Sequence, residues 1–150
     1  MALRQLRLSN VQEVGVRKMS DAYAGVIIEE SLKKKDILKK IKILATKVEK
    51  VTPEHHTPHL KQWTLHTVQI AEQQADKVAK ELSRQLTTTH GHWYADFKNT
   101  KYHCIIFHNK IFRVDRSKKE QYNAVVNYGL TLGIPEYQLD FSPAIKEWER

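Results

Sequence analysis

Three polar residues on neighbouring predicted strands are the strongest candidates for chemistry in this sequence. A two-residue turn at Asn99-Thr100 would place Asp96 opposite His103, and a three-residue loop at the next turn would place Asp115 opposite the same histidine. A carboxylate beside an imidazole fixes its tautomer and raises its pKa, as a general base requires. One hypothesis is therefore a small enzyme built on Asp96, His103 and Asp115. The alternative is a row of cross-strand charge pairs, each contributing about 0.2–1 kcal/mol.

Three further residues are expected to adjoin this polar row. Alternation along the strands places His92 and Tyr94 on the same face as His103. Arg113 is expected nearby, and its guanidinium could hold a carboxylate or phosphate. The opposite face is predicted to be the apolar core and to include Cys104, which we expect to be buried and unreactive.

The remaining histidines and the motif content predict no metal and no cofactor. His55, His56 and His59 lie in a proline-containing loop, where they cannot adopt the helical spacing of a zinc protease. His90 and His92 could chelate, but a zinc site needs three or four convergent ligands. The sequence also lacks a nucleophile elbow, a Walker loop and a dinucleotide-binding glycine motif.

The positive charge is concentrated in one segment. Residues 31–50 contain eight lysines against Asp36 and Glu49, and so hold six of the eight surplus positive charges of the chain. Localised charge of this kind can attract phosphates or an acidic partner, and Lys39 and Lys40 are the candidate contacts. The alternative is that these lysines form the solvated face of an amphipathic helix.

Size and composition are typical of one globular domain. The chain has 150 residues, 41% hydrophobic and 28% charged, with few glycines and prolines. We expect a single domain over residues 19–150, preceded by a loosely packed extension at 1–18; an ordinary first strand at 6–16 is the alternative. One cysteine allows no internal disulfide and, with no apolar run long enough to cross a bilayer, favours a cytoplasmic protein without membrane contact.

Hydrophobic periodicity predicts an α+β fold. Strands are expected at 24–29, 41–50, 63–70, 92–97, 102–107, 111–115 and 138–141, and helices at 31–40, 71–86 and 117–130. A proline-rich loop is expected at 51–62. From residue 63 this order matches a ferredoxin-like (split βαβ) sandwich, with two or three helices on one face of a mainly antiparallel sheet. The N-terminal β-α-β segment would extend that sheet.

Three functions remain open at this point. The leading hypothesis is a non-enzymatic binding or regulatory module that uses an open sheet face for a protein or anionic partner, with self-association into a homodimer across that face. The second is the small enzyme of Asp96, His103 and Asp115. The third is a nucleic-acid-binding domain that uses the lysine-rich helix and aromatic residues of the sheet.

Overall fold

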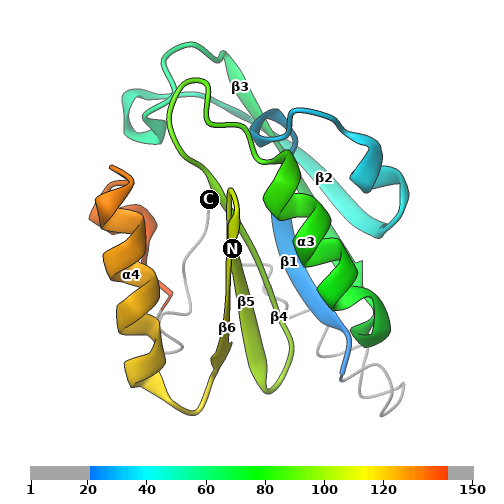
Figure 1. Cartoon of the computed structure of the whole chain (residues 1–150). Helices are drawn as coiled ribbons and strands as arrows, with labels where there is room; N and C mark the ends of the chain where they lie inside the picture. The colour runs from blue at the N-terminus through cyan, green and yellow to red at the C-terminus, as the bar shows by residue number, and fades with distance from the viewer. Residues whose placement is uncertain (1–20, 142–150) are drawn as a thin grey trace.

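The computed structural model describes residues 21–141 and confirms the α+β class. Its centre is one six-stranded sheet in which all neighbouring strands are antiparallel (Figure 1). The order across the sheet is β2-β3-β1-β4-β5-β6. The strands are β1 (Tyr23–Ile28), β2 (Lys42–Lys50), β3 (Gln62–Ile70), β4 (Tyr94–Lys98), β5 (Tyr102–Phe107) and β6 (Lys110–Asp115).

A split βαβ unit organises the centre of the sheet. Strands β3 and β4 both pair antiparallel with β1, so they run parallel to each other with β1 between them. Helix α3 (Ala75–Gln85) makes the crossover between β3 and β4. Its apolar stripe, which includes Val78, Ala79 and Leu82, packs into a core with Phe97 and Ile106 of the sheet.

The second helix, α4 (Tyr122–Thr131), covers the other face of the sheet, with β4, β5 and β6 lying between the two helices in Figure 1. The expectation that all helices pack on one face is therefore wrong. The physical reason lies in β5, where Cys104 and Ile106 face the α3 side while Ile105 and Phe107 face the α4 side, and all four are buried. A strand that is apolar on both faces needs cover on both faces.

Two predicted elements differ from the structure. The helix expected at 31–40 is replaced by two short 3-10 turns, η1 (Glu29–Ser31) and η2 (Asp36–Lys39), because only a few apolar side chains, Leu32 and Ile37 among them, find a buried place here. The strand expected at 138–141 is replaced by the turn η6 (Glu136–Gln138), so the described residues do not complete a second β-α-β unit and the ferredoxin-like arrangement is not confirmed. The extension predicted at 1–18 lies outside the described residues.

Both hairpin registers differ from their predictions because asparagines shape the turns. Asn99 Oδ1 accepts hydrogen bonds from the backbone N–H groups of Lys101 and Tyr102, at 2.9 and 2.8 Å, and this widens the β4–β5 connection so that Lys98 pairs with His103. That change is a shift of two residues, which keeps every side chain on its predicted face. At the next turn Asn109 adopts a left-handed φ of 60°, which allows a tight connection with Phe107 paired to Lys110.

The shift at the β5–β6 turn is one residue, and it moves the side chains of β6 to the opposite face. His103 pairs with Val114, whereas Asp115 pairs with Tyr102. Asp115 therefore projects from the face opposite His103. Within the described range, no helix has the length and hydropathy needed to cross a membrane.

Candidate functional site

The structure brings together two of the three residues of the predicted enzyme site. His103 Nε2 lies 2.6 Å from Asp96 Oδ2, and its Nδ1 lies 2.9 Å from the Tyr122 hydroxyl of α4. A carboxylate accepts, so Nε2 donates to Asp96 and Nδ1 of the neutral ring accepts from Tyr122. Asp115 does not join them: its Oδ1 accepts hydrogen bonds from the backbone N–H and hydroxyl of Ser117.

The environment of His103 favours a structural role. Its side chain is only 2% exposed, so a substrate could reach the ring only if α4 moved. Burial lowers the pKa of His103, and the hydrogen bond to Asp96 opposes this without outweighing it. Burial also raises the pKa of Tyr122. We interpret the trio as a hydrogen-bonded link between the β4–β5 hairpin and the helix above it.

The other predicted site residues are dispersed over the molecule. Arg113 stacks over the ring of Tyr102, with its guanidinium carbon 3.9 Å from the ring centre, on the face opposite His103. The Tyr94 hydroxyl donates to the backbone oxygen of Gln138. Cys104 is buried as expected, and burial raises the pKa of its thiol to about 11.

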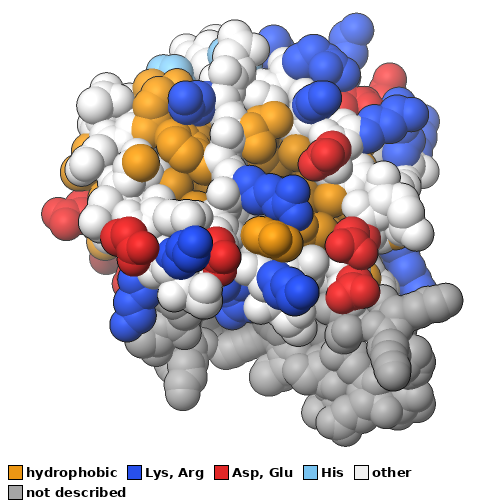
Figure 2. Space-filling model, turned by 60° about the horizontal axis from the view of Figure 1, so that its bottom comes forward, with side chains coloured by type: hydrophobic (Ala, Val, Ile, Leu, Met, Phe, Trp, Pro, Cys, Tyr) orange, Lys and Arg blue, Asp and Glu red, His pale blue; other side chains and the backbone are white. Residues whose placement is uncertain are grey.

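The predicted lysine contacts lie beside the sheet rather than on a helix. Lys39 ends η2 and is exposed, and Lys40 follows it with its Nζ 3.3 Å from Glu81 of α3. In Figure 2, Lys and Arg side chains are interspersed with hydrophobic and acidic ones. That face of the molecule therefore does not present the continuous basic groove that tracks a nucleic-acid backbone.

A cavity of about 220 Å³ is the most site-like feature of the described residues. Three segments far apart in the sequence surround it: the loop before β3, the loop before β4 and the connection after α4. We call it the histidine pocket because four imidazoles line it. Its histidine and aromatic lining consists of His55, His56, His90, His92, Trp63, Trp93 and Tyr94; Ile28, Thr57, Gly91 and the residues Leu132, Gly133, Ile134, Pro135 and Gln138 complete it.

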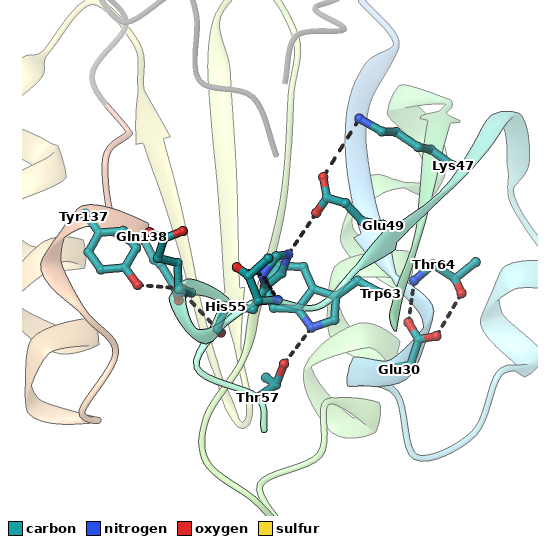
Figure 3. A network of polar contacts seen from close by, with 11 residues as sticks. Glu30, Lys47, Glu49, His55, Thr57, Trp63, Thr64, Tyr137 and Gln138 are labelled. Atoms are coloured by element: carbon teal, nitrogen blue, oxygen red, sulfur yellow. Dashed lines mark hydrogen bonds and ion pairs between the residues drawn. The ribbon is translucent and has the colours of Figure 1, made fainter. Parts of the chain in front are cut away.

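His55 is held rigidly on the first of these segments (Figure 3). It ends the 3-10 turn η3 (Pro53–His55), and its Nδ1 accepts the backbone N–H of Thr52 at 3.0 Å. Because Nδ1 accepts, the proton lies on Nε2, which donates to Glu49 of β2 at 3.1 Å. Both ring nitrogens are thus occupied. The ring edge also contacts Trp63, with 4.3 Å between ring centres.

The indole of Trp63 forms the floor of the pocket. It is buried, and its Nε1 donates to the Thr57 hydroxyl at 2.9 Å. Its ring centre lies 5.3 Å from that of Trp93, which arrives from the loop before β4. The two indoles therefore present adjoining aromatic surface to the cavity.

The segment after α4 closes the pocket from a third side. Figure 3 shows Tyr137 and Gln138 reaching toward η3. The Tyr137 hydroxyl donates to the backbone oxygen of Glu54 at 2.5 Å, and Gln138 Nε2 donates to the same oxygen at 3.4 Å. The ring of Tyr137 also lies against His56, with 5.9 Å between ring centres. These contacts tie residues that are more than 80 positions apart.

The lining determines what the pocket can bind. Aromatic rings and imidazoles supply seven of its fifteen lining residues, and among the described residues that line it there is no Asp, Glu, Lys or Arg. Three of the four histidines, His56, His90 and His92, are exposed. Across residues 21–141 no three His, Cys, Asp or Glu side chains are placed to hold a metal ion.

A second hydrogen-bonded imidazole lies on β3. His66 Nδ1 is 2.9 Å from the Thr46 hydroxyl of β2, and its Nε2 is 2.8 Å from Glu29 Oε1. Glu29 also pairs with Lys35 at 3.0 Å, and the hydrogen bonds from His66 and Lys35 lower the pKa of its carboxyl. This row joins β2, β3 and η1, and we interpret it as a link that holds the edge of the sheet in place.

Sequence reasoning named His92 and Tyr94 of this lining as binding residues and considered His90 with His92 as a possible chelating pair. It did not predict the histidine pocket, because the pocket exists only when three loops meet. The sequence did carry one signal: both VTPEHHTPHL and HGHWY combine histidines with turn residues. Each segment also lies close to a tryptophan, Trp63 or Trp93, on or beside a strand. This shared feature could have suggested that the two segments meet in the fold.

Comparison with known proteins gives no match. No family model matches this chain, and no curated protein or solved structure is significantly similar to it. The functional argument therefore depends on the geometry of the described residues.

Proposed function

We propose that this chain is a binding module whose histidine pocket takes a small aromatic anion, with a single-ring carboxylate as the simplest member of that class. The observation that carries the proposal is a pocket walled by two tryptophans, a tyrosine and four histidines, without an acidic side chain in its described lining. Tryptophan and histidine rings favour a flat aromatic ligand. The N–H groups of imidazole rings can donate hydrogen bonds to a carboxylate.

The volume restricts the size of the ligand. Sites for drug-sized molecules are about 300–1,000 Å³, and the pocket, at about 220 Å³, is smaller. One six-membered ring with a carboxylate suits this space, whereas a nucleotide does not. A ligand with so few atoms is expected to bind with a Kd of about 0.1–1 mM.

The bonding within the pocket favours binding over catalysis. A general base needs a free nitrogen, but both ring nitrogens of His55 are already engaged by Thr52 and Glu49. The Thr57 hydroxyl accepts from Trp63 and the Tyr94 hydroxyl donates to Gln138, so neither is poised as a nucleophile. The proposal keeps the binding module of the leading hypothesis but moves its site, since α4 covers the β4–β6 part of the sheet face expected to be open.

Tryptophan fluorescence tests the proposal directly. Trp63 and Trp93 line the pocket, and Trp148→Phe removes the third tryptophan of the chain. In that background, benzoate should change the emission with half-saturation at about 0.1–1 mM. Benzamide, which lacks the charge, and cyclohexanecarboxylate, which lacks the aromatic ring, should both bind more weakly than benzoate.

Matched variants locate the effect. His92→Gln should weaken benzoate binding, because it removes one imidazole from the lining. His108→Gln, at the β5–β6 turn outside the pocket, should leave it unchanged. If benzoate has no effect on the emission, or if benzamide binds as tightly as benzoate, the proposal is wrong.

A further inference from the structure

Strand β2 is an edge of the sheet that the rest of the described chain leaves uncovered. It pairs on one side with β3, and no strand of residues 21–141 pairs with its other side. Eight of its nine residues are exposed. They include three large apolar side chains, with 38% of Ile43, 39% of Leu44 and 58% of Val48 accessible to solvent. Such an edge offers backbone N–H and C=O groups to an incoming strand.

The opposite edge strand of the sheet, β6, packs against the core. In β6, Val114 is buried and Phe112 packs against the core beneath α4. Neither hydrophobic core cluster of the described residues includes a residue of β2. Within residues 21–141, the apolar side chains of β2 are therefore exposed although the strand is well paired: the Thr46–His66 hydrogen bond and eight residue pairs with β3 hold it.

The two faces of β2 have different chemistry. Its register with β3 places Ile43 and Val48 on one face, opposite Val68 and Thr64. A bulge at Leu44 separates Ile43 from the regular part of the strand. Lys42 and Lys47 project from the other face, together with Ala45 and Glu49, whereas Thr46 and Lys50 share the face of Ile43 and Val48. A strand added to this edge would meet apolar side chains on one face and ammonium groups on the other.

The charge along β2 indicates which kind of strand could pair with its free edge. Within β2, Lys42, Lys47 and Lys50 stand against Glu49 alone, and Lys39 and Lys40 precede the strand, with Lys40 Nζ 3.3 Å from Glu81. The Glu49 carboxylate is already bonded to His55 and near Lys47. A second copy of β2 would bring lysines toward lysines, and like charges across strands are destabilising. Lysines and a bulge are also devices by which edges discourage strand pairing, and acidic side chains opposite the lysines would offset the electrostatic part of that barrier.

We propose that β2 is a docking edge for an acidic extended segment of another protein, which adds to the sheet as a seventh strand. The segment alternates apolar residues, which pack beside Ile43 and Val48, with Asp or Glu, which face Lys42 and Lys47. Backbone hydrogen bonds hold the added strand, and the alternation sets its register. The edge adjoins the lining of the histidine pocket only near Glu49, which pairs with Trp63 and bonds His55, and the inference does not depend on the proposed ligand.

The test uses a nine-residue peptide of alternating valine and glutamate with blocked ends. Titrated into the isotopically labelled full chain, it should shift the amide signals of residues 42–50 and slow their hydrogen exchange. A peptide of the same composition with valines and glutamates in two blocks should bind at least about tenfold more weakly, because it cannot place one residue type on each face. The amides of β6, the other edge, should not change.

Charge-reversal variants distinguish specific binding at β2 from non-specific electrostatic attraction. Lys42→Glu with Lys47→Glu should abolish binding of the valine–glutamate peptide and restore binding of a valine–lysine peptide. Lys118→Glu with Lys119→Glu, exposed lysines near the start of α4, should change neither. Rescue by the valine–lysine peptide also shows that the reversed variant is folded.

Four results would overturn the inference. These are equal binding of the alternating and blocked peptides, protection of amides away from β2, a dimer of the free chain joined through β2 by light scattering and hydrogen exchange, and stronger protection of residues 42–50 by a single-stranded RNA than by the peptide. The last would instead support nucleic-acid binding through the lysine-rich segment.

Discussion

His103 donates a hydrogen bond from Nε2 to Asp96 across the β4–β5 hairpin, at 2.6 Å, although the two residues are not direct partners in the strand ladder. Asp96 pairs with Ile105, and His103 pairs with Lys98, so the contact is diagonal. The same imidazole accepts from Tyr122 of α4. One buried imidazole therefore links β4 and β5 to α4. Replacing it tests how much these hydrogen bonds stabilise the fold.

Replacing His103 with leucine should lower the free energy of unfolding by about 2–3 kcal/mol. The change keeps an apolar side chain in the core, but it deprives Asp96 and the Tyr122 hydroxyl of their hydrogen bonds to the ring in a region shielded from water. Urea unfolding at pH 7.5 measures the loss. Asp115→Asn is the matched control, since that residue lies on the opposite face near the surface, and it should cost under about 1 kcal/mol. Similar losses in both variants would contradict the structural role.

The stability difference between the wild type and His103→Leu should depend on pH. Burial depresses the pKa of folded His103 below its ordinary value of 6.5, so the unfolded chain binds the proton more readily. The stability contributed by the neutral ring is full above pH 6.5 and is lost as the pH falls from there toward the folded-state pKa. The difference between wild type and His103→Leu should therefore shrink between pH 7.5 and pH 5.5. A difference that grows on acidification would mean that the folded pKa is raised.

How far the sequence predicts the structure is clearest in β5. The run CIIF is apolar at consecutive positions, and this pattern belongs to a strand buried on both faces. Alternation in β4 predicted one core face correctly but left the second unrecognised, so α4 was expected on the wrong side. Strand positions followed from the pattern, whereas the cover over each face depends on packing between distant segments.

The hairpin registers and the histidine pocket are harder to predict from the sequence than the strand positions. Asn99 and Asn109 decide the two hairpin connections through a side-chain hydrogen bond and a left-handed backbone, and a difference of one residue at the second turn separates Asp115 from His103. The pocket depends on the contact between Tyr137 and Glu54, which are 83 residues apart. Local periodicity carries no information about such a contact.

Two glycines predict contrasting responses to alanine. At Gly25 of β1 an added Cβ would lie 2.1 Å from the backbone oxygen of Asp96, so β1 and β4 would have to separate. At Gly129 of α4 the nearest atom, 2.6 Å away, belongs to the flexible end of Leu139. Gly25→Ala should cost about 3 kcal/mol or more, whereas Gly129→Ala should cost less, because the side chain can shift and alanine favours the helix by about 1 kcal/mol. Thermal unfolding compares them, and an equal loss would contradict the close approach of β1 and β4.

Tyr137 should control the histidine pocket more than it controls the stability of the fold. Tyr137→Phe keeps the ring beside His56 but removes the hydrogen bond to the Glu54 backbone oxygen. We expect a loss of about 1 kcal/mol or less in global stability, because the side chain is exposed, together with faster hydrogen exchange in residues 53–57. Benzoate should bind several-fold more weakly, since η3 carries His55 and leads into His56 of the lining. Tyr137→Leu, which also removes the ring, should weaken binding further. Unchanged exchange and affinity in both variants would mean that the segment after α4 does not position the loop, and the pocket would then be shaped by the two tryptophans alone.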